Sequence, residues 1–336
     1  MVSAHPEDLE SQDLLEEGPR RRQVPHRKVD VVEADDTERE LPGHERGSPR
    51  PSFPFYGLGR PRTPVRTTRG TLPSPSGPRS ELRAVFFDLD DTVFDHAGAR
   101  RAALRLWLIE HPRTRKRTLE EVDRRYQVLL DAIHPKVLAG KVSSEVARVD
   151  RFELLARWMG APSSRKEAIR SAARYRESYL RNRRAIPGAR ELMTDLHGSV
   201  FVGIITNNAQ SEQEEKLRYL RLGGRVDLLV TSEKVGWSKP DPRIFETALR
   251  KASVPAEASV MVGDSLRDDV LGAHRSGLGA IWFGPRKRND PRIPGVVRLP
   301  AFLPLERAHR VLRVAHRNGP PPARERRRPR RRGTGA

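Results

Sequence analysis

The feature that most constrains the fold is a short apolar segment that ends abruptly in three carboxylates. Residues 84–87 are Ala-Val-Phe-Phe, and Asp88, Asp90 and Asp91 follow at once, with Thr92 behind them. A short run of β-branched and aromatic residues predicts a buried strand. In a parallel α/β sheet, functional groups gather at the carboxyl ends of the strands, where the sheet leaves a crevice. This stretch therefore predicts a strand that delivers carboxylates to a site.

Three clustered carboxylates need a compensating charge, because unpaired they repel and raise one another's pKa values. A divalent cation removes that repulsion, and hard oxygen ligands suit Mg²⁺. In such a site Asp88 is a candidate nucleophile and Asp90 a candidate proton donor. An isolated Asp-x-Asp is more often a solvated acidic turn, so the interpretation depends on what the rest of the chain supplies.

The second half of the chain alternates strands with helices. Apolar runs predict strands at residues 200–205, 226–230, 259–262 and 280–283, and helical patterns occupy residues 188–197, 209–222, 242–252 and 266–276. Strands that alternate with helices indicate βαβ units and a parallel sheet. The pair Gly223-Gly224 is typical of a helix C-terminus and predicts where the second of these helices ends.

Residues 95–185, by contrast, have the pattern of four helices and contain no convincing strand. Two capping boxes, one from Thr118 to Glu121 and one from Ser164 to Glu167, predict where two of these helices begin. The expected fold is α/β, a Rossmann-like doubly wound parallel sheet core with an inserted α-helical cap domain, flanked by disordered tails. We assign the core domain to residues 81–94 and 186–302, the cap to 95–185, and a short helix followed by a basic disordered tail to 303–336.

Composition limits what the remaining residues can do. Residues 1–80 are rich in Pro, Gly, Ser and charge, which buries too little apolar surface to offset chain entropy, so we expect them to be disordered. The chain has no cysteine, which excludes disulfides, thiolate catalysis and cysteine-based zinc sites. No secretory signal is visible, and no apolar run approaches the roughly 20 residues that span a bilayer. These features predict a soluble, cytoplasmic protein with no membrane partner.

The net charge of +20 is unevenly distributed. Residues 301–336 carry +9 of it, mostly in the arginine run at 324–332. Such a tail could make weak, salt-sensitive and non-specific contacts with nucleic acid. No aromatic residues are interleaved with the arginines, so base stacking is not indicated. A solvated tail is the preferred interpretation.

Polar side chains follow three more of the predicted strands. Thr206-Asn207-Asn208 offers a hydroxyl and amides that suit phosphate oxygens, and Lys239, between Ser238 and Pro240, is a point charge for phosphate or for a carboxylate. Asp264 and Asp269 follow the strand at 259–262 and add carboxylates for a metal. Each match alone means little. Because all four groups follow strands in order, they are expected to meet at one edge of the sheet.

This pattern resembles the haloacid dehalogenase superfamily, whose members are mostly magnesium-dependent phosphatases. The resemblance covers residues 83–285, and its four motifs are Asp88 to Thr92, Thr206, Lys239, and Asp264 with Asp269. The helical insertion directly after the first motif is similar to the subgroup in which an α-helical cap closes over the site.

The resemblance implies a mechanism and a set of ligands. Asp88 attacks phosphorus and forms an aspartyl-phosphate, while Asp90 protonates the leaving alkoxide and then deprotonates water. Magnesium would be held by Asp88, the backbone carbonyl of Asp90 and Asp264, with Asp269 ordering its water ligands. Thr206, Asn207 and Lys239 would bind the substrate, and Thr206 and Lys239 would stabilise the phosphoryl oxygens together with the metal.

Several functions remain open at this point. A 2-haloacid dehalogenase expels halide, which needs no proton, so the acid at Asp90 favours a phosphatase acting on a small phosphorylated metabolite. A phosphomutase shares these residues and differs mainly in its cap. The contrasting class is a non-catalytic, nucleic-acid-associated protein that uses its basic tail. His96, where the chain passes into the predicted cap, is a candidate substrate contact; the alternative is a hinge or surface histidine.

Overall fold

The computed structural model describes residues 81–111 and 117–320. The predictions for residues 1–80 and for the arginine run at 324–332 concern segments outside the described residues.

The described part of the chain contains a six-stranded sheet in which every neighbouring pair is parallel. The strands are β1 (Ala84–Phe87), β2 (Phe201–Thr206), β3 (Leu228–Thr231), β4 (Ser259–Gly263), β5 (Gly279–Phe283) and β6 (Val296–Leu299). Their order is β3-β2-β1-β4-β5-β6. The doubly wound parallel sheet is therefore confirmed. The edge strand β6 was not predicted, because Arg298 interrupts its apolar run and three of its four residues are only partly buried.

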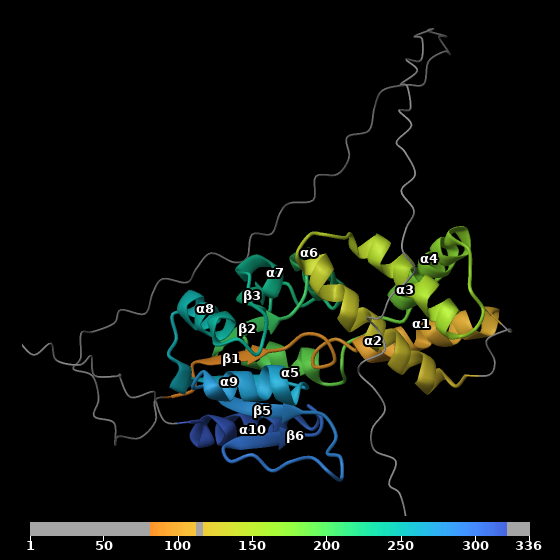
Figure 1. Cartoon of the computed structure of the whole chain (residues 1–336). Helices are drawn as coiled ribbons and strands as arrows, with labels where there is room; N and C mark the ends of the chain where they lie inside the picture. Colours follow the sequence, from red (N-terminus) through yellow and green to blue (C-terminus); the bar gives the residue numbers. More distant parts are fainter. Residues whose placement is uncertain (1–80, 112–116, 321–336) are drawn as a thin grey trace, which may run out of the picture. The chain divides into compact units, whose positions relative to one another are not determined.

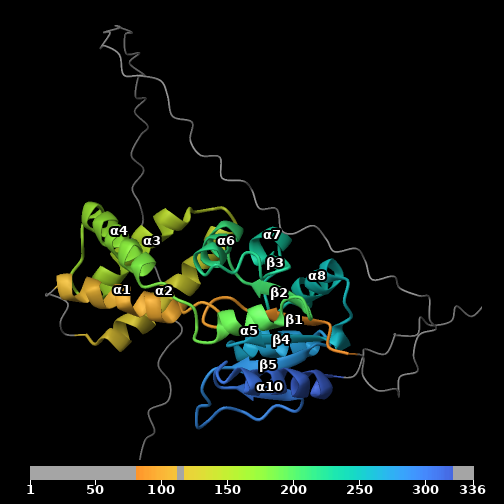
Figure 2. The same ribbon diagram turned by 180° about the vertical axis from the view of Figure 1, so that it is seen from behind.

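Helices cover both faces of this sheet (Figures 1 and 2). Val85 and Phe87 of β1 pack in one apolar cluster with α5 (Ala189–Leu196) and α10 (Leu305–Asn318). Phe86 points to the other face and packs with α8 (Pro242–Ala252) and α9 (Gly272–Arg275). Successive side chains of a strand alternate between faces, so a strand covered on both sides must be apolar throughout. The residues before Asp88 are all apolar because β1 is covered by helices on both faces.

The other elements between the strands are short. They are α6 (Gln210–Tyr219), α7 (Ser232–Val235), a 3₁₀ turn η2 (Ala256–Ala258) and a π-helical turn η3 (Leu266–Leu271). Helix α6 ends before Gly223-Gly224, so that predicted end is wrong. Leu220 and Leu222 turn into the core, and Arg221 between them takes a positive φ of 55°. None of the helices in the described residues is long and apolar enough to cross a membrane.

The described residues between β1 and β2 form five helices, and α5 is the last of them. The four that precede it are α1 (His96–Glu110), α2 (Leu119–Leu138), α3 (Ser144–Trp158) and α4 (Arg165–Arg181). Both predicted capping boxes are confirmed, at the starts of α2 and α4. The two connections to the sheet run side by side, because Phe94 bridges Ala185 and the amide of Ile186 donates to the carbonyl of Val93 at 2.9 Å. We call α1–α4 the helical insertion. Its role as a closing cap, with the boundaries given above, stays a prediction.

Candidate active site

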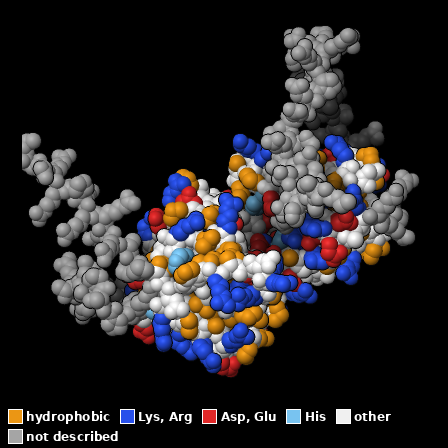
Figure 3. Space-filling model, turned by 60° about the horizontal axis from the view of Figure 1, so that its bottom comes forward, with side chains coloured by type: hydrophobic (Ala, Val, Ile, Leu, Met, Phe, Trp, Pro, Cys, Tyr) orange, Lys and Arg blue, Asp and Glu red, His pale blue; other side chains and the backbone are white. Residues whose placement is uncertain are grey.

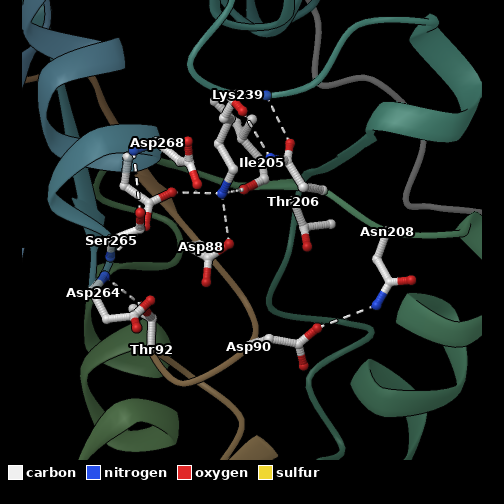
Figure 4. Close-up of polar contacts among 12 residues, drawn as sticks. Asp88, Asp90, Thr92, Ile205, Thr206, Asn208, Lys239, Asp264, Ser265 and Asp268 are labelled. Carbon is white, nitrogen blue, oxygen red and sulfur yellow. Dashed lines mark hydrogen bonds and ion pairs between the residues drawn. The ribbon is translucent and has the colours of Figure 1, made fainter. Parts of the chain in front are cut away.

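The ammonium group of Lys239 is the centre of the site. Its Nζ lies 2.6 Å from Oδ1 of Asp88, 2.6 Å from Oδ1 of Asp269 and 2.7 Å from the carbonyl oxygen of Ile205. Asp88 follows β1 directly, in the middle of the sheet, and its amide donates to Val262 of β4 at 2.9 Å. Figure 4 shows Lys239 pointing at Asp88. Residues about 150 positions apart in the chain thus form one buried ion-pair network.

Three carboxylates meet beside this lysine. One oxygen from each of Asp88, Asp264 and Asp269 lies within 4.8 Å of the others. The hydroxyl of Thr92 accepts the amide of Asp264 at 3.1 Å and so fixes the start of that loop. A Cβ on Gly263 would lie 2.3 Å from Cγ of Asp269, so only glycine leaves room for the Asp269 carboxylate at the end of β4.

This cluster has one cation for three carboxylates, and its titration reflects the imbalance. Burial raises the pKa of Asp88 well above its ordinary value; Lys239 opposes the shift, and the carboxylates of Asp269 and Asp264 add to it. Burial lowers the pKa of Lys239, but the carboxylates of Asp269 and Asp88 raise it by more, so the ammonium stays charged. A further cation with a preference for hard oxygen ligands fits this donor set, and the residues that would hold it are Asp88, Asp264 and Asp269.

Asp90 lies apart from the three clustered carboxylates, in a polar group of its own. Nζ of Lys216 lies 2.6 and 2.7 Å from its two carboxylate oxygens, and Nε2 of Gln213 donates to it at 3.0 Å. Burial alone would raise the pKa of Asp90, but the Lys216 ammonium holds it below its ordinary value. Nδ2 of Asn208 also lies 3.4 Å from Oδ2 of Asp90, as Figure 4 shows. In the ligand-free protein Asp90 is a carboxylate.

The predicted substrate-binding residues after β2 have different surroundings. The Thr206 hydroxyl is buried and accepts a hydrogen bond from Gln213 at 3.0 Å. The Asn207 side chain forms two bonds with the backbone of Lys239, donating to its carbonyl at 2.9 Å and accepting its amide at 2.7 Å. Its amide group therefore positions the lysine loop, and a contact between Asn207 and substrate would have to come from its backbone.

His96, at the start of α1, lies in the cavity wall beside Tyr179 of α4. Its Nδ1 is 2.8 Å from the tyrosine hydroxyl, and the two rings are 5.5 Å apart. Burial lowers the pKa of His96 to about 4, although the charge of Asp90 opposes the shift. The imidazole is therefore neutral at pH 7.

This shift predicts how stability depends on pH. An unfolded chain protonates its histidines near the ordinary pKa of 6.5, whereas folded His96 resists protonation until about pH 4. The contribution of His96 to the unfolding free energy is therefore fully present above pH 6.5 and is lost as the pH falls toward 4. Between pH 7 and pH 5, the wild type should lose on the order of 1 kcal/mol more unfolding free energy than His96→Gln. The effect is this small because the ring is partly exposed to solvent, which screens its charge. Urea denaturation at both pH values measures the difference, and equal losses would contradict it.

A cavity of about 520 Å³ lies between the sheet and the helical insertion. Its walls include all the candidate residues from the sheet edge together with cationic and aromatic residues of the insertion. The space-filling view shows red and blue side chains close together in a hollow of the surface (Figure 3). The predicted site residues that line it are Asp88, Asp90, Thr206, Asn207, Lys239, Asp264 and Asp269.

The sequence did not indicate several residues of this cavity. Lys216 lies in a run of Gln and Glu on α6 and has the sequence context of a solvated surface lysine, yet it is only 6% exposed. Gln213, one helical turn before it, is fully buried and connects Asp90 to Thr206. The only available signal was their spacing of three residues, which places both on one face of α6.

Comparison with known proteins identifies the family of the chain and agrees with its fold. The model of the haloacid dehalogenase-like hydrolases matches residues 82–277, which is more than half of the chain. The chain belongs to this family, and it is a hydrolase of the haloacid dehalogenase type. The resemblance drawn from the four motifs is thereby confirmed.

Three individual proteins show how similar the chain is to known members. The chain is 32% identical over 213 residues to the glyceraldehyde 3-phosphate phosphatase of Methanothermobacter thermautotrophicus, covering 60% of this chain and 84% of that protein. It is 39% identical over 107 residues to the pyrimidine 5'-nucleotidase YjjG of Escherichia coli, covering 32% and 48%. The solved structure of the HAD-hydrolase YfnB from Bacillus subtilis matches with a TM-score of 0.55 and 23% identity, over 70% of this chain and all of that one. At 23% identity, the match to the YfnB structure shows a shared fold and nothing more.

Proposed function

We propose that this protein is a magnesium-dependent phosphomonoester hydrolase that acts on a small phosphorylated metabolite through an aspartyl-phosphate at Asp88. The observation that carries the proposal is the contact of Lys239 with both Asp88 and Asp269, beside the third carboxylate of Asp264. The family membership and the similarity to a glyceraldehyde 3-phosphate phosphatase support the same reaction class.

In this proposal Asp88 is the nucleophile. One of its oxygens attacks phosphorus, the ester oxygen departs, and water later hydrolyses the acyl phosphate. Lys239 holds the carboxylate in place and, with the Thr206 hydroxyl, would offset charge on the transferring phosphoryl oxygens. Asn207 contributes indirectly, because its side chain fixes the backbone of Lys239.

Asp90 would serve as the acid and base. Its pairing with Lys216 keeps it ionised before substrate binds, which suits the step in which it takes a proton from water. To protonate the leaving oxygen it must first gain a proton. An anionic phosphate near Asp90 favours this, because like charge raises the pKa of a carboxylate.

A magnesium ion held by Asp88, Asp264 and Asp269 would supply positive charge to the phosphoryl oxygens. The excess of carboxylates over cations in the cluster supports the assignment. Asp90, by contrast, could contribute only through its backbone, because its carboxylate is occupied by Lys216 and Gln213.

The related chemistries are less favoured. A dehalogenase needs no proton donor, whereas here Asp90 is held by three side chains beside the nucleophile. A phosphomutase would use the same residues and would return the phosphoryl group to an organic acceptor. Release of inorganic phosphate, measured against isomerised product, separates the two.

Removal of the metal tests the proposal. Hydrolysis of a panel of phosphomonoesters is expected to fall at least about a hundredfold after dialysis against EDTA and to recover on adding magnesium, because the phosphoryl charge would lose its largest compensating charge. Phosphate release measures the rate. Calcium serves as the control cation, since it accepts oxygen ligands but prefers longer bonds and higher coordination numbers. Full activity in EDTA would refute the magnesium assignment.

A further inference from the structure

Two arginines of the helical insertion face the cavity without a carboxylate partner. Arg148 and Arg151 both lie on α3, one helical turn apart, and both line the cavity that contains Asp88. Within residues 81–111 and 117–320, neither guanidinium forms an ion pair, and Nε of Arg151 is buried without a hydrogen-bond partner.

The other three arginines of the cavity are paired. Arg100 lies 2.8 Å from Asp123, and Arg176 and Arg183 lie 3.1 and 2.7 Å from the two carboxylate oxygens of Glu215. These pairs satisfy their charges within the protein. Arg148 and Arg151 therefore stand out as cations whose partner is missing from the fold itself.

The missing partner matters because neither side chain is freely exposed to water: Arg151 is buried and Arg148 is half-buried. Arg151 is only 7% exposed, and its guanidinium lies 5.3 Å from the centre of the Tyr126 ring. A cation–π contact offsets part of the cost of burying a charge, but an oxyanion offsets far more. Burial lowers the pKa of Arg148, and the positive charges of Arg176 and Arg151 lower it further. Tyr126 and the Glu212 carboxylate oppose this shift without reversing it. The repulsion among these arginines would be relieved by an anion between them.

An aromatic wall connects the arginines with the reaction centre. The rings of Tyr126 and Tyr175 are 5.1 Å apart, those of Tyr175 and Tyr179 are 6.2 Å apart, and the Tyr179 hydroxyl contacts His96. All four residues line the cavity. A substrate lying along this wall would have one end at Asp88 and the other near α3.

We propose that Arg148 and Arg151 bind a second anionic group of the substrate, a carboxylate or a second phosphate, remote from the phosphate that Asp88 attacks. A guanidinium presents a planar fork of donors that matches either oxyanion. The inference rests on the proposed function for the identity of the first phosphate. It narrows the substrate class to small phosphomonoesters with two separated anionic groups.

Matched substrate pairs test the proposal. One pair is 3-phosphoglycerate and glycerol 3-phosphate, which differ by a carboxylate; the other is fructose 1,6-bisphosphate and fructose 6-phosphate, which differ by a phosphate. The wild type should hydrolyse the doubly anionic member of at least one pair with a kcat/KM about tenfold higher or more. The pair that shows the preference identifies the second group as carboxylate or phosphate.

Variants assign the preference to the two arginines. Arg148→Gln should lower kcat/KM for the favoured substrate by about 10- to 100-fold and for its partner by less than about threefold, as expected for loss of one charge-assisted hydrogen bond. Arg151→Lys keeps the charge but loses the planar fork, so it should also lower kcat/KM for the favoured substrate. Arg157→Gln, on the exposed side of α3, is the matched control and should leave the ratio unchanged. Equal rates for both members of both pairs, or a ratio that Arg148→Gln does not change, would overturn the proposal.

A binding measurement separates this inference from the proposed function. Asp88→Asn protein, with and without Arg148→Gln, is titrated calorimetrically with 3-phosphoglycerate, glycerol 3-phosphate and the two fructose phosphates. Preferential binding of a doubly anionic ligand that requires Arg148, in a protein whose wild type hydrolyses none of the four, would support the anion site and refute the phosphatase. Hydrolysis that requires Asp88 but shows no preference for the second anion would support the phosphatase and refute the anion site.

Discussion

Asp88→Asn is expected to abolish phosphomonoester hydrolysis, with kcat reduced by about ten-thousandfold or more. An amide oxygen does not attack phosphorus to form a stable acyl phosphate, and no other carboxylate occupies its position at the end of β1. Phosphate release under saturating magnesium measures the loss. Asp150→Asn, on α3 and paired with Arg165, removes a carboxylate away from the cavity and is the control.

The same substitution has an expected effect on stability. Burial raises the pKa of Asp88, and the carboxylates of Asp269 and Asp264 add to the shift against the opposing charge of Lys239, so the ionised form of Asp88 is held at a cost. Asparagine has almost the same shape and removes one charge from the cluster. Without magnesium, the melting temperature of Asp88→Asn should therefore equal or exceed that of the wild type, a common result when functional strain is relieved. A variant that is inactive and also strongly destabilised would indicate a structural role for Asp88 instead.

Lys239→Met is expected to reduce both activity and stability. Methionine keeps much of the length of the side chain but loses the ammonium that contacts Asp88, Asp269 and the carbonyl of Ile205. Breaking a buried ion pair from one side typically costs about 3–5 kcal/mol, because the partner charges are left uncompensated. We expect a loss of about 3 kcal/mol in unfolding free energy and a fall of about a thousandfold in kcat.

Magnesium distinguishes the electrostatic cause from a packing defect. A cation bound to the folded state stabilises it by mass action. If the carboxylates of Asp88, Asp264 and Asp269 hold magnesium, the ion should raise the melting temperature of Lys239→Met more than that of the wild type, because it replaces missing positive charge. Lys234→Met, on the exposed surface of α7, is the control. No difference between the magnesium responses would contradict this account.

Much of the fold was predictable because its signals are local. Apolar runs marked five of the six strands, and the capping boxes at Thr118 and Ser164 marked helix starts that the structure confirms. Local signals were weaker where tertiary contacts decide the outcome. Leu220 and Leu222 end α6 early by turning into the core, and β6 is a strand only because β5 lies beside it.

The convergence of Asp88, Thr206, Lys239 and Asp264 was also predictable, because the carboxyl ends of neighbouring parallel strands meet at one edge of a sheet. The sequence by itself thus determined the fold class and the residues that gather at that edge. Only the tertiary structure decided which charges are buried and which are paired. Lys216 and Arg151 have the sequence context of solvated residues, and their roles depend on what packs above them. Charge pairing is a property of distance in space, and a linear pattern does not contain it.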